Sequence, residues 1–294
     1  MNLYSIVFII LTVASLPIAL QHDPLRSTAF ILMATAMSST SFLVYYKRLE
    51  FLAAGSVHTS LLAVTLGYIG AYYVLGGVES MHGYFTVFLL AIIVGLMIIY
   101  LIGVLIRRGV SQEKASAIGV SLTTTLSVIA IQYALTAIPI RYSLSSIILG
   151  EPLLISRDEA IIGVAISLSI VVLSILFHRE IVETSIDPIS ASLTGIKTGV
   201  YDFLVYTLIG FSSIGLLKFA GYVMEHVLIL LPATIAVYYS SSLREHYVET
   251  LVIGISSSAI GYSLSLLSNT PPAGLTGLIL ILLLTIGLIR GVGK

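Results

Sequence analysis

Three ionisable side chains lie inside long apolar stretches of the sequence: His58, Glu225 and His226. An ionisable group is costly in such a stretch, so each is a candidate for a functional role. Imidazole and carboxylate groups are ligands of divalent metal ions. At 1.5 Å per helical residue, His58 is expected roughly 10 Å and Glu225 about 6 Å from the start of their helices. Two simpler interpretations stay open: His58 hydrogen-bonded to a neighbouring helix, and Glu225 and His226 hydrated near Lys218.

A second group of residues lies in the longest polar stretch between two apolar ones, at about 179–197. Asp187 followed by Pro188 is typical of a helix start, with Asp as the N-cap and Pro in the first turn. Gly195 is typical of a helix end. The pattern therefore predicts a short helix between two apolar segments, which serves either as an ordinary connector or as a docking element for another protein.

The elements that position these residues follow from composition. Hydrophobic residues make up 57% of the 294 residues and charged residues 10%, and the mean hydropathy is +1.08. A soluble chain carries roughly 25% charged residues, so most of this surface must face lipid. We expect an all-α integral membrane protein, a polytopic helical bundle of about 8–10 transmembrane helices in a single domain, 1–294. The candidate spans are 3–20, 27–46, 51–75, 82–106, 113–138, 158–178, 199–219, 222–240, 247–268 and 273–290. The break at 218–222 is the weakest, so spans 199–219 and 222–240 are alternatively a re-entrant pair.

The distribution of Lys and Arg predicts the orientation of the spans. If both termini and the 179–197 loop are cytoplasmic, ten of the 14 basic residues fall inside and four, including Arg141 and Lys218, fall outside. The sequence thus predicts a multi-pass protein of the cell (plasma) membrane. His178 and His246 are expected at solvated helix ends on the cytoplasmic side.

Several classes of chemistry are excluded by what the sequence lacks. There is no Cys, which removes disulfides and thiolate metal sites, and the net charge of zero argues against a nucleic-acid partner. The sequence contains no G-x-x-x-x-G-K-[ST], H-E-x-x-H or G-x-S-x-G motif. The chain is therefore not expected to be an enzyme, and energy for transport must come from a partner protein or an ion gradient.

Four segments resemble, in order and spacing, the permease family of zinc/manganese-type, binding-protein-dependent ABC importers. They are Arg48-Leu49-Glu50-Phe51-Leu52 with His58, Ala117-Ile118-Gly119-Val120, Ser185-Ile186-Asp187-Pro188 with Ala191 and Gly195, and Leu231-Pro232-Ala233-Thr234 with Gly221 upstream. A fifth, Ile148-Leu149-Gly150 followed by Ser156-Arg157-Asp158, resembles the outer segment of that family. Together they extend over about residues 45–290.

The resemblance implies a function and a set of partners. It implies a dimer of permeases, two cytoplasmic ABC ATPase subunits that hydrolyse ATP, and an extracellular metal-binding protein. The transported substrate would be a divalent metal ion (zinc, manganese or iron), with no cofactor bound by this chain. It also implies ATPase coupling through Asp187, Pro188, Ala191 and Gly195, and a metal contact at His58.

Two positions depart from the family pattern. The family places an Asp four residues before the His, on the same helical face, where this sequence has Ala54; a second family Asp is Ala115 here. A metal site needs several deprotonated ligands, so the metal interpretation is weaker than the permease interpretation. Two alternatives stay open. Ten spans with both termini inside also fit a gradient-driven secondary transporter of small metabolites built from inverted repeats, and the two alanines fit a transport-inactive permease-like subunit.

Overall fold

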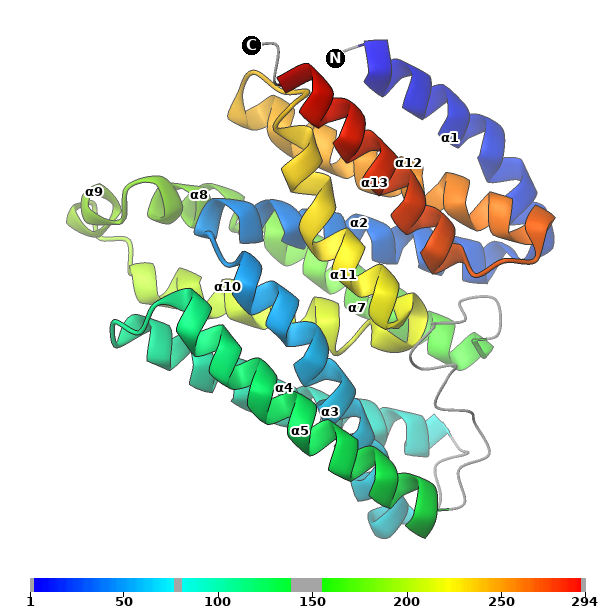
Figure 1. Cartoon of the computed structure of the whole chain (residues 1–294), viewed down its shortest axis with the longest axis vertical. Coiled ribbons are helices and arrows are strands. Elements are labelled where there is room, and N and C mark those ends of the chain that lie inside the picture. Colours follow the sequence, from blue (N-terminus) through cyan, green and yellow to red (C-terminus); the bar gives the residue numbers. More distant parts are fainter. Residues whose placement is uncertain (1–2, 77–80, 139–154, 292–294) are drawn as a thin grey trace.

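The computed structural model describes residues 3–76, 81–138 and 155–291 (Figure 1). Arg141 and the Ile148-Leu149-Gly150 segment lie outside the described residues. The helices are α1 (Leu3–His22), α2 (Pro24–Lys47), α3 (Glu50–Leu75), α4 (Met81–Arg107), α5 (Gln112–Ala137), α7 (Arg157–Leu176), α8 (His178–Ile186), α9 (Pro188–Leu193), α10 (Thr198–Ser213), α11 (Leu217–Ala236), α12 (Leu243–Ser268) and α13 (Pro272–Gly291). In the described part, eight of them are long and apolar enough to cross a membrane: α2, α3, α4, α5, α7, α11, α12 and α13. The predicted polytopic helical membrane protein is confirmed.

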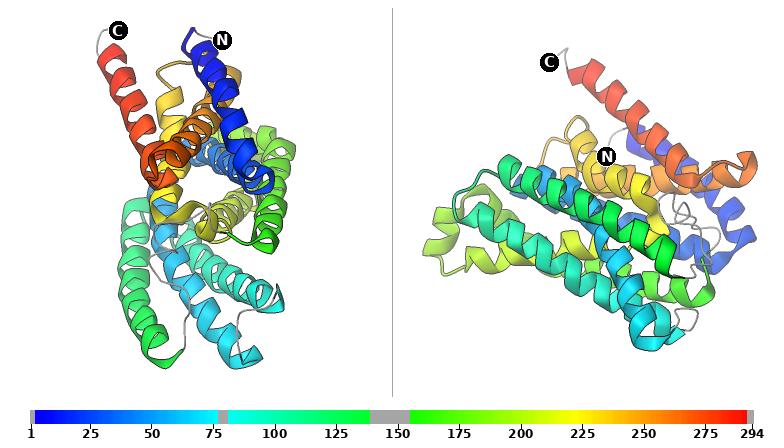
Figure 2. Two further views of the ribbon diagram at one scale, coloured as in Figure 1. Left: turned by 90° about the vertical axis from the view of Figure 1, so that its right-hand side faces the viewer. Right: turned by 60° about the horizontal axis from the view of Figure 1, so that its bottom comes forward.

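The helices form two groups with a seam between them. Helices α3, α4 and α5 pack on one another at one end of the long axis, whereas α1, α12 and α13 lie toward the other end and α2 crosses the middle (Figures 1 and 2). Helix α2 is central in the larger group and contacts α7, α11 and α12. Helices α10 and α11 lie between the groups and contact both α2 and α3. Residues on α11 and α3 therefore face each other across the seam.

Small hydroxyl residues allow α2 to pack closely on its neighbours. Ser38 faces Gly254 of α12, where a Cβ atom would collide with the Ser38 hydroxyl. The hydroxyls of Thr40 and Ser212 are 2.7 Å apart, and the Ser41 hydroxyl accepts a hydrogen bond from the Ala233 amide at 3.2 Å. Small residues let helices approach and hydrogen-bond across a membrane interface, which explains why this stretch is polar yet buried.

The segment predicted as spans 199–219 and 222–240 is an uneven hairpin. Helix α10 has 16 residues, about 24 Å of helix, which is short of the roughly 30 Å of a bilayer core. The chain turns at 214–216, before the predicted break, and then enters α11. Inside α11, Gly221 leaves the helical conformation at φ 72°, a region that favours glycine. The predicted break therefore exists as an interruption within one helix, and the turn between the two helices lies earlier.

The 179–197 segment holds two helices where the sequence predicted one. The predicted helix start at Pro188 is confirmed as α9, but α8 precedes it and was missed. Helix α8 buries Ile181 and Val182 and exposes the Arg179–Glu183 ion pair, which spans one helical turn. Helix α8 therefore packs against the bundle and carries α9 outward (Figure 1).

The beginning of α1 and the end of α13 lie at the same end of the molecule (Figures 1 and 2). We expect the beginning of α1, the end of α13, and α8 and α9 all to lie on the cytoplasmic side of the membrane. Single cysteines at Ser192 and Thr270, both exposed and at opposite ends of the bundle, should then react with impermeant reagents from opposite sides of the membrane. The chain has no native cysteine, so each label reports one site. Labelling of Thr270→Cys from the cytoplasmic side would reverse the proposed orientation.

Candidate functional site

His58 of α3 meets two residues of α11 across the seam. The Tyr222 hydroxyl lies 3.3 Å from Nδ1 and 3.2 Å from Nε2 of His58. The ring centres of His58 and His226 are 6.0 Å apart, and those of Tyr222 and His226 are 4.8 Å apart. The Thr124 hydroxyl of α5 lies 3.3 Å from His58 Nδ1. Two of the predicted pathway residues, His58 and His226, are thus neighbours although they are far apart in sequence.

Glu225, the third predicted pathway residue, is buried inside the bundle against α3. It is 0% exposed, and its Oε2 accepts a hydrogen bond from the Ser60 hydroxyl at 3.3 Å. Its Oε1 has no hydrogen-bond partner among the described residues. The hydrated interfacial position that the sequence left open is therefore wrong for Glu225, because neighbouring helices exclude solvent from it.

Sequence reasoning missed Tyr222, whereas Thr124 lies in a threonine run that the sequence offered as a possible hydroxyl lining of a hydrated path. Tyr222 is one helical turn before His226, and it directly follows the Gly221 interruption. The spacing of Tyr222 and His226 could have shown that they share a face of α11, but it could not show that His58 lies opposite. Thr124 belongs to a run of three threonines, of which only Thr123 is buried.

The two alanines that replace family carboxylates differ in their surroundings. Ala54 is half-buried, one helical turn from His58 and on the same face of α3. Ala115 is fully buried. Within the described residues, no group of three or more His, Asp or Glu side chains could hold a metal ion. A single chain therefore offers an incomplete ligand set around His58.

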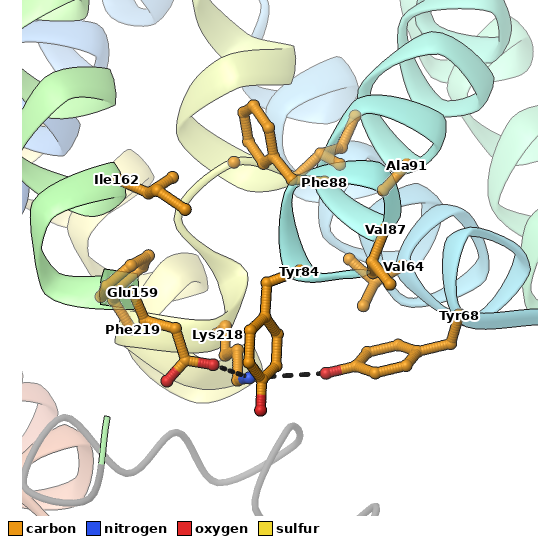
Figure 3. Close-up of a pocket in the computed structure, with 12 residues that line it drawn as sticks. Val64, Tyr68, Tyr84, Val87, Phe88, Ala91, Glu159, Ile162, Lys218 and Phe219 are labelled. Carbon is orange, nitrogen blue, oxygen red and sulfur yellow. Dashed lines mark hydrogen bonds and ion pairs between the residues drawn. The ribbon is translucent and has the colours of Figure 1, made fainter. Parts of the chain in front are cut away.

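A small cavity of about 70 Å³ is lined by Val64 and Tyr68 of α3, about two to three helical turns beyond His58 (Figure 3). Lys218 of α11 lines this cavity and forms an ion pair with Glu159 of α7. The Lys218 ammonium also lies 3.5 Å from the Tyr68 hydroxyl and 4.5 Å from the centre of the Tyr84 ring. Lys218 thus joins α11 to α7, α3 and α4, and it closes the seam at the end of α7 that the orientation places outside.

The predicted coupling residues form a well-capped turn at the opposite end. One Asp187 oxygen accepts hydrogen bonds from the Ile189 and Ser190 amides at 3.1 and 3.0 Å. The Ser190 hydroxyl donates to the other oxygen at 2.6 Å, and these bonds hold the pKa of Asp187 below its usual range. Pro188 starts α9, and Ala191 is buried beneath it.

Gly195 ends this turn at φ 89°, in the left-handed region, while the Ile196 amide donates to the Ala191 carbonyl at 3.0 Å. The outer face of the turn is apolar: Ile186, Ile189 and Leu193 are 65%, 73% and 83% exposed. We call these three residues the apolar tip.

His246 and His178 are packed side chains, so the prediction of solvated helix ends is wrong. His246 is buried, and its Nε2–H donates to the Ala233 carbonyl at 2.8 Å, while the Tyr46 hydroxyl donates to its Nδ1 at 3.0 Å. The His178 ring stacks on Phe42 at 5.2 Å, and burial lowers the pKa of His178. Through Phe42, α8 is therefore in contact with the residues that hold the end of α11.

Lys47 adds a second connection between α8 and the bundle. Its ammonium donates to the Thr184 hydroxyl at 2.9 Å and to Asp202 Oδ1 at 2.7 Å. The Lys47 side chain is almost fully buried, so these contacts tie α2, α8 and α10 together beneath the apolar tip.

Comparison with known proteins identifies a family and relatives with similar sequences. Residues 25–291 match the family model described as the ABC 3 transport family. A Thermotoga maritima protein named "Probable metal transport system membrane protein" is 28% identical over 221 residues, covering 73% of this chain and 72% of that one. The manganese import system permease protein ScaB of Streptococcus gordonii is 21% identical over 229 residues, covering 72% and 81%.

A solved structure shares the fold. A chain of "PsaBC from Streptococcus pneumoniae in complex with Fab" has a TM-score of 0.74 and 20% identity, with 94% of this chain and 95% of that chain covered. At this level of identity, the likeness concerns the arrangement of the helices.

Proposed function

We propose, because this chain belongs to the ABC 3 transport family, that it is the membrane-spanning permease subunit of an importer for a divalent metal ion. The observation that carries the metal assignment is the position of His58. It lies eight residues, about 12 Å, into α3, and it faces Tyr222 and His226 across the seam between the two helix groups. An ionisable ligand at this depth belongs on an ion path. The metal-transport names of the relatives agree with this assignment.

The second part of the proposal concerns coupling to ATP hydrolysis. The apolar tip projects from a turn that is fixed by the Asp187 cap, Gly195 and the Lys47 contacts. Exposed apolar side chains on a rigid, short helix suit a hydrophobic groove in another protein. We infer that a cytoplasmic ABC ATPase subunit docks here, and that ATP is hydrolysed on that subunit.

The remaining partners follow from the same function. We propose that two permease copies form the path, since one chain supplies too few ligands for a complete site. An extracellular metal-binding protein would deliver the ion at the end that Lys218 closes. The metal ion is cargo and not a cofactor of this chain.

Family membership disfavours a secondary transporter with inverted repeats. The transport-inactive alternative rests on Ala54, one helical turn from His58, and on the buried Ala115.

Metal accumulation in cells tests the proposal. Cells that express this chain with its ATPase and binding protein should accumulate a divalent metal above the level of cells that lack only this chain. His58→Ala should remove most of that gain, whereas His82→Ala, which changes an exposed histidine of α4, should not. Equal metal content with and without the chain would favour the transport-inactive alternative.

A further inference from the structure

We propose that His58 and His226 bind the transported ion together, and that this imidazole pair makes the path select Zn²⁺ over Mn²⁺. The inference rests on the proposed function and specifies its substrate. The family pattern places a carboxylate beside the first histidine, and this chain has Ala54 there. The second histidine comes from a different helix, α11, and reaches the same place in the seam.

The distance between the rings suits one shared ion. With a Zn–N bond of about 2.0–2.1 Å, the ring centres of two histidines on one ion are roughly 5–6 Å apart, depending on the angle at the metal. The ring centres of His58 and His226 are 6.0 Å apart, with an interplanar angle of 86°. The separation of the two ring centres therefore permits both rings to contact one ion.

The hydrogen bond of His226 prepares it to be a ligand. Its Nδ1 lies 3.1 Å from the Tyr222 carbonyl oxygen, which can only accept, so Nδ1 carries the proton. The lone pair is then on Nε2, and it is available for a metal ion. Histidine ligands of metals usually donate their other N–H to a carbonyl or carboxylate in this way, because the bond fixes the tautomer and orients the ring.

Two hydroxyls complete the surroundings of the pair. Tyr222 lies beside both rings, with its hydroxyl within 3.3 Å of both His58 nitrogens, and Thr124 approaches His58 from α5. These groups can supply an oxygen ligand or hold a metal-bound water. The site remains short of four strong protein ligands, which suits transport, because a bound ion must also be able to leave.

The chemistry of the ligands decides the preferred ion. Imidazole suits Zn²⁺, whereas Mn²⁺ binds most divalent sites more weakly and prefers carboxylate oxygens. The carboxylate nearest in sequence, Glu225, is buried against Ser60 of α3, and Glu225 and the two histidines do not form a group that could hold a metal ion. The two histidines thus replace a carboxylate–histidine arrangement with a nitrogen-rich one.

The experiment measures metal binding to the purified full-length chain in detergent, with Zn²⁺ and Mn²⁺ in direct competition. The wild type should bind Zn²⁺ at least about tenfold more tightly than Mn²⁺. His226→Ala and His58→Ala should each weaken Zn²⁺ binding by about tenfold or more, and His82→Ala should leave it unchanged. Ala54→Asp should strengthen Mn²⁺ binding relative to Zn²⁺, because it restores a carboxylate one turn from His58.

Two results overturn the inference: tighter binding of Mn²⁺ than Zn²⁺ by the wild type, or wild-type Zn²⁺ affinity in His226→Ala. The first needs no variant, so it stands even where a substitution impairs folding. Failure of this inference differs from failure of the proposed function. Cells would still accumulate a divalent ion through the complex in the first case, and no divalent ion in the second.

Discussion

Leu193→Asp is expected to abolish binding of the ATPase subunit while the chain still inserts in the membrane. Leu193 is 83% exposed at the end of α9 and is the most exposed residue of the apolar tip. Burying a leucine in an interface contributes about 1.5–3 kcal/mol, and a desolvated, unpaired carboxylate in its place adds a further cost. Together they should weaken the complex by about 100-fold or more. Co-purification of the ATPase with the tagged chain measures this loss.

Two matched variants separate docking from charge and from folding. Leu193→Met keeps an apolar side chain of similar size and should retain the ATPase. Thr270→Asp adds the same charge at an exposed position at the far end of the bundle and should also retain it. Normal ATPase recovery with Leu193→Asp would show that the apolar tip is not the docking surface.

Lys218→Met should lower the thermal stability of the purified protein more than any single surface change. It leaves the Glu159 carboxylate, which is almost fully buried, without its cation. Removing one partner of a fully buried pair costs roughly 3–5 kcal/mol. Since the Lys218 side chain is 32% exposed, we expect about 2–3 kcal/mol here. The melting temperature in detergent reports the loss.

A double variant tests whether the stranded charge is the cause. Lys218→Met combined with Glu159→Gln should recover much of the stability, because glutamine keeps the capping interaction with Ser156 and carries no charge. The exposed Arg179–Glu183 pair serves as control, and Arg179→Gln should change the melting temperature little. Equal melting temperatures of Lys218→Met and the wild type would mean that solvent already screens Glu159.

Hydropathy predicted most of the spans because a helix that faces lipid must be apolar along its length, whatever it packs against. It could not predict α8, whose buried Ile181 and Val182 are too few to resemble a span and depend on contacts with α2. It also misplaced the turn between α10 and α11. The Gly221 conformation marks an interruption, but only packing decides that the helix resumes after it.

The candidate site was predictable residue by residue but not as a group. His58 and His226 stand out in an apolar sequence, yet only the fold brings α3 and α11 together and places Tyr222 beside both histidines. The burial of Glu225 has the same origin. The sequence predicted Glu225 about 6 Å from the helix start, but α11 begins at Leu217, so Glu225 lies eight residues, about 12 Å, into the helix. The neighbouring helices that exclude water from it were not readable from the sequence either.

Flux through reconstituted vesicles tests the proposed import function most directly. The chain, its ATPase subunit and the external binding protein would be assembled in lipid vesicles with ATP on the ATPase side. We predict that Zn²⁺ is moved from the binding-protein side to the ATPase side against its gradient, that this requires ATP, and that His58→Ala removes it. Metal movement driven by a proton gradient without the ATPase, or no ATP-dependent metal movement in the complete assembly, would contradict the account.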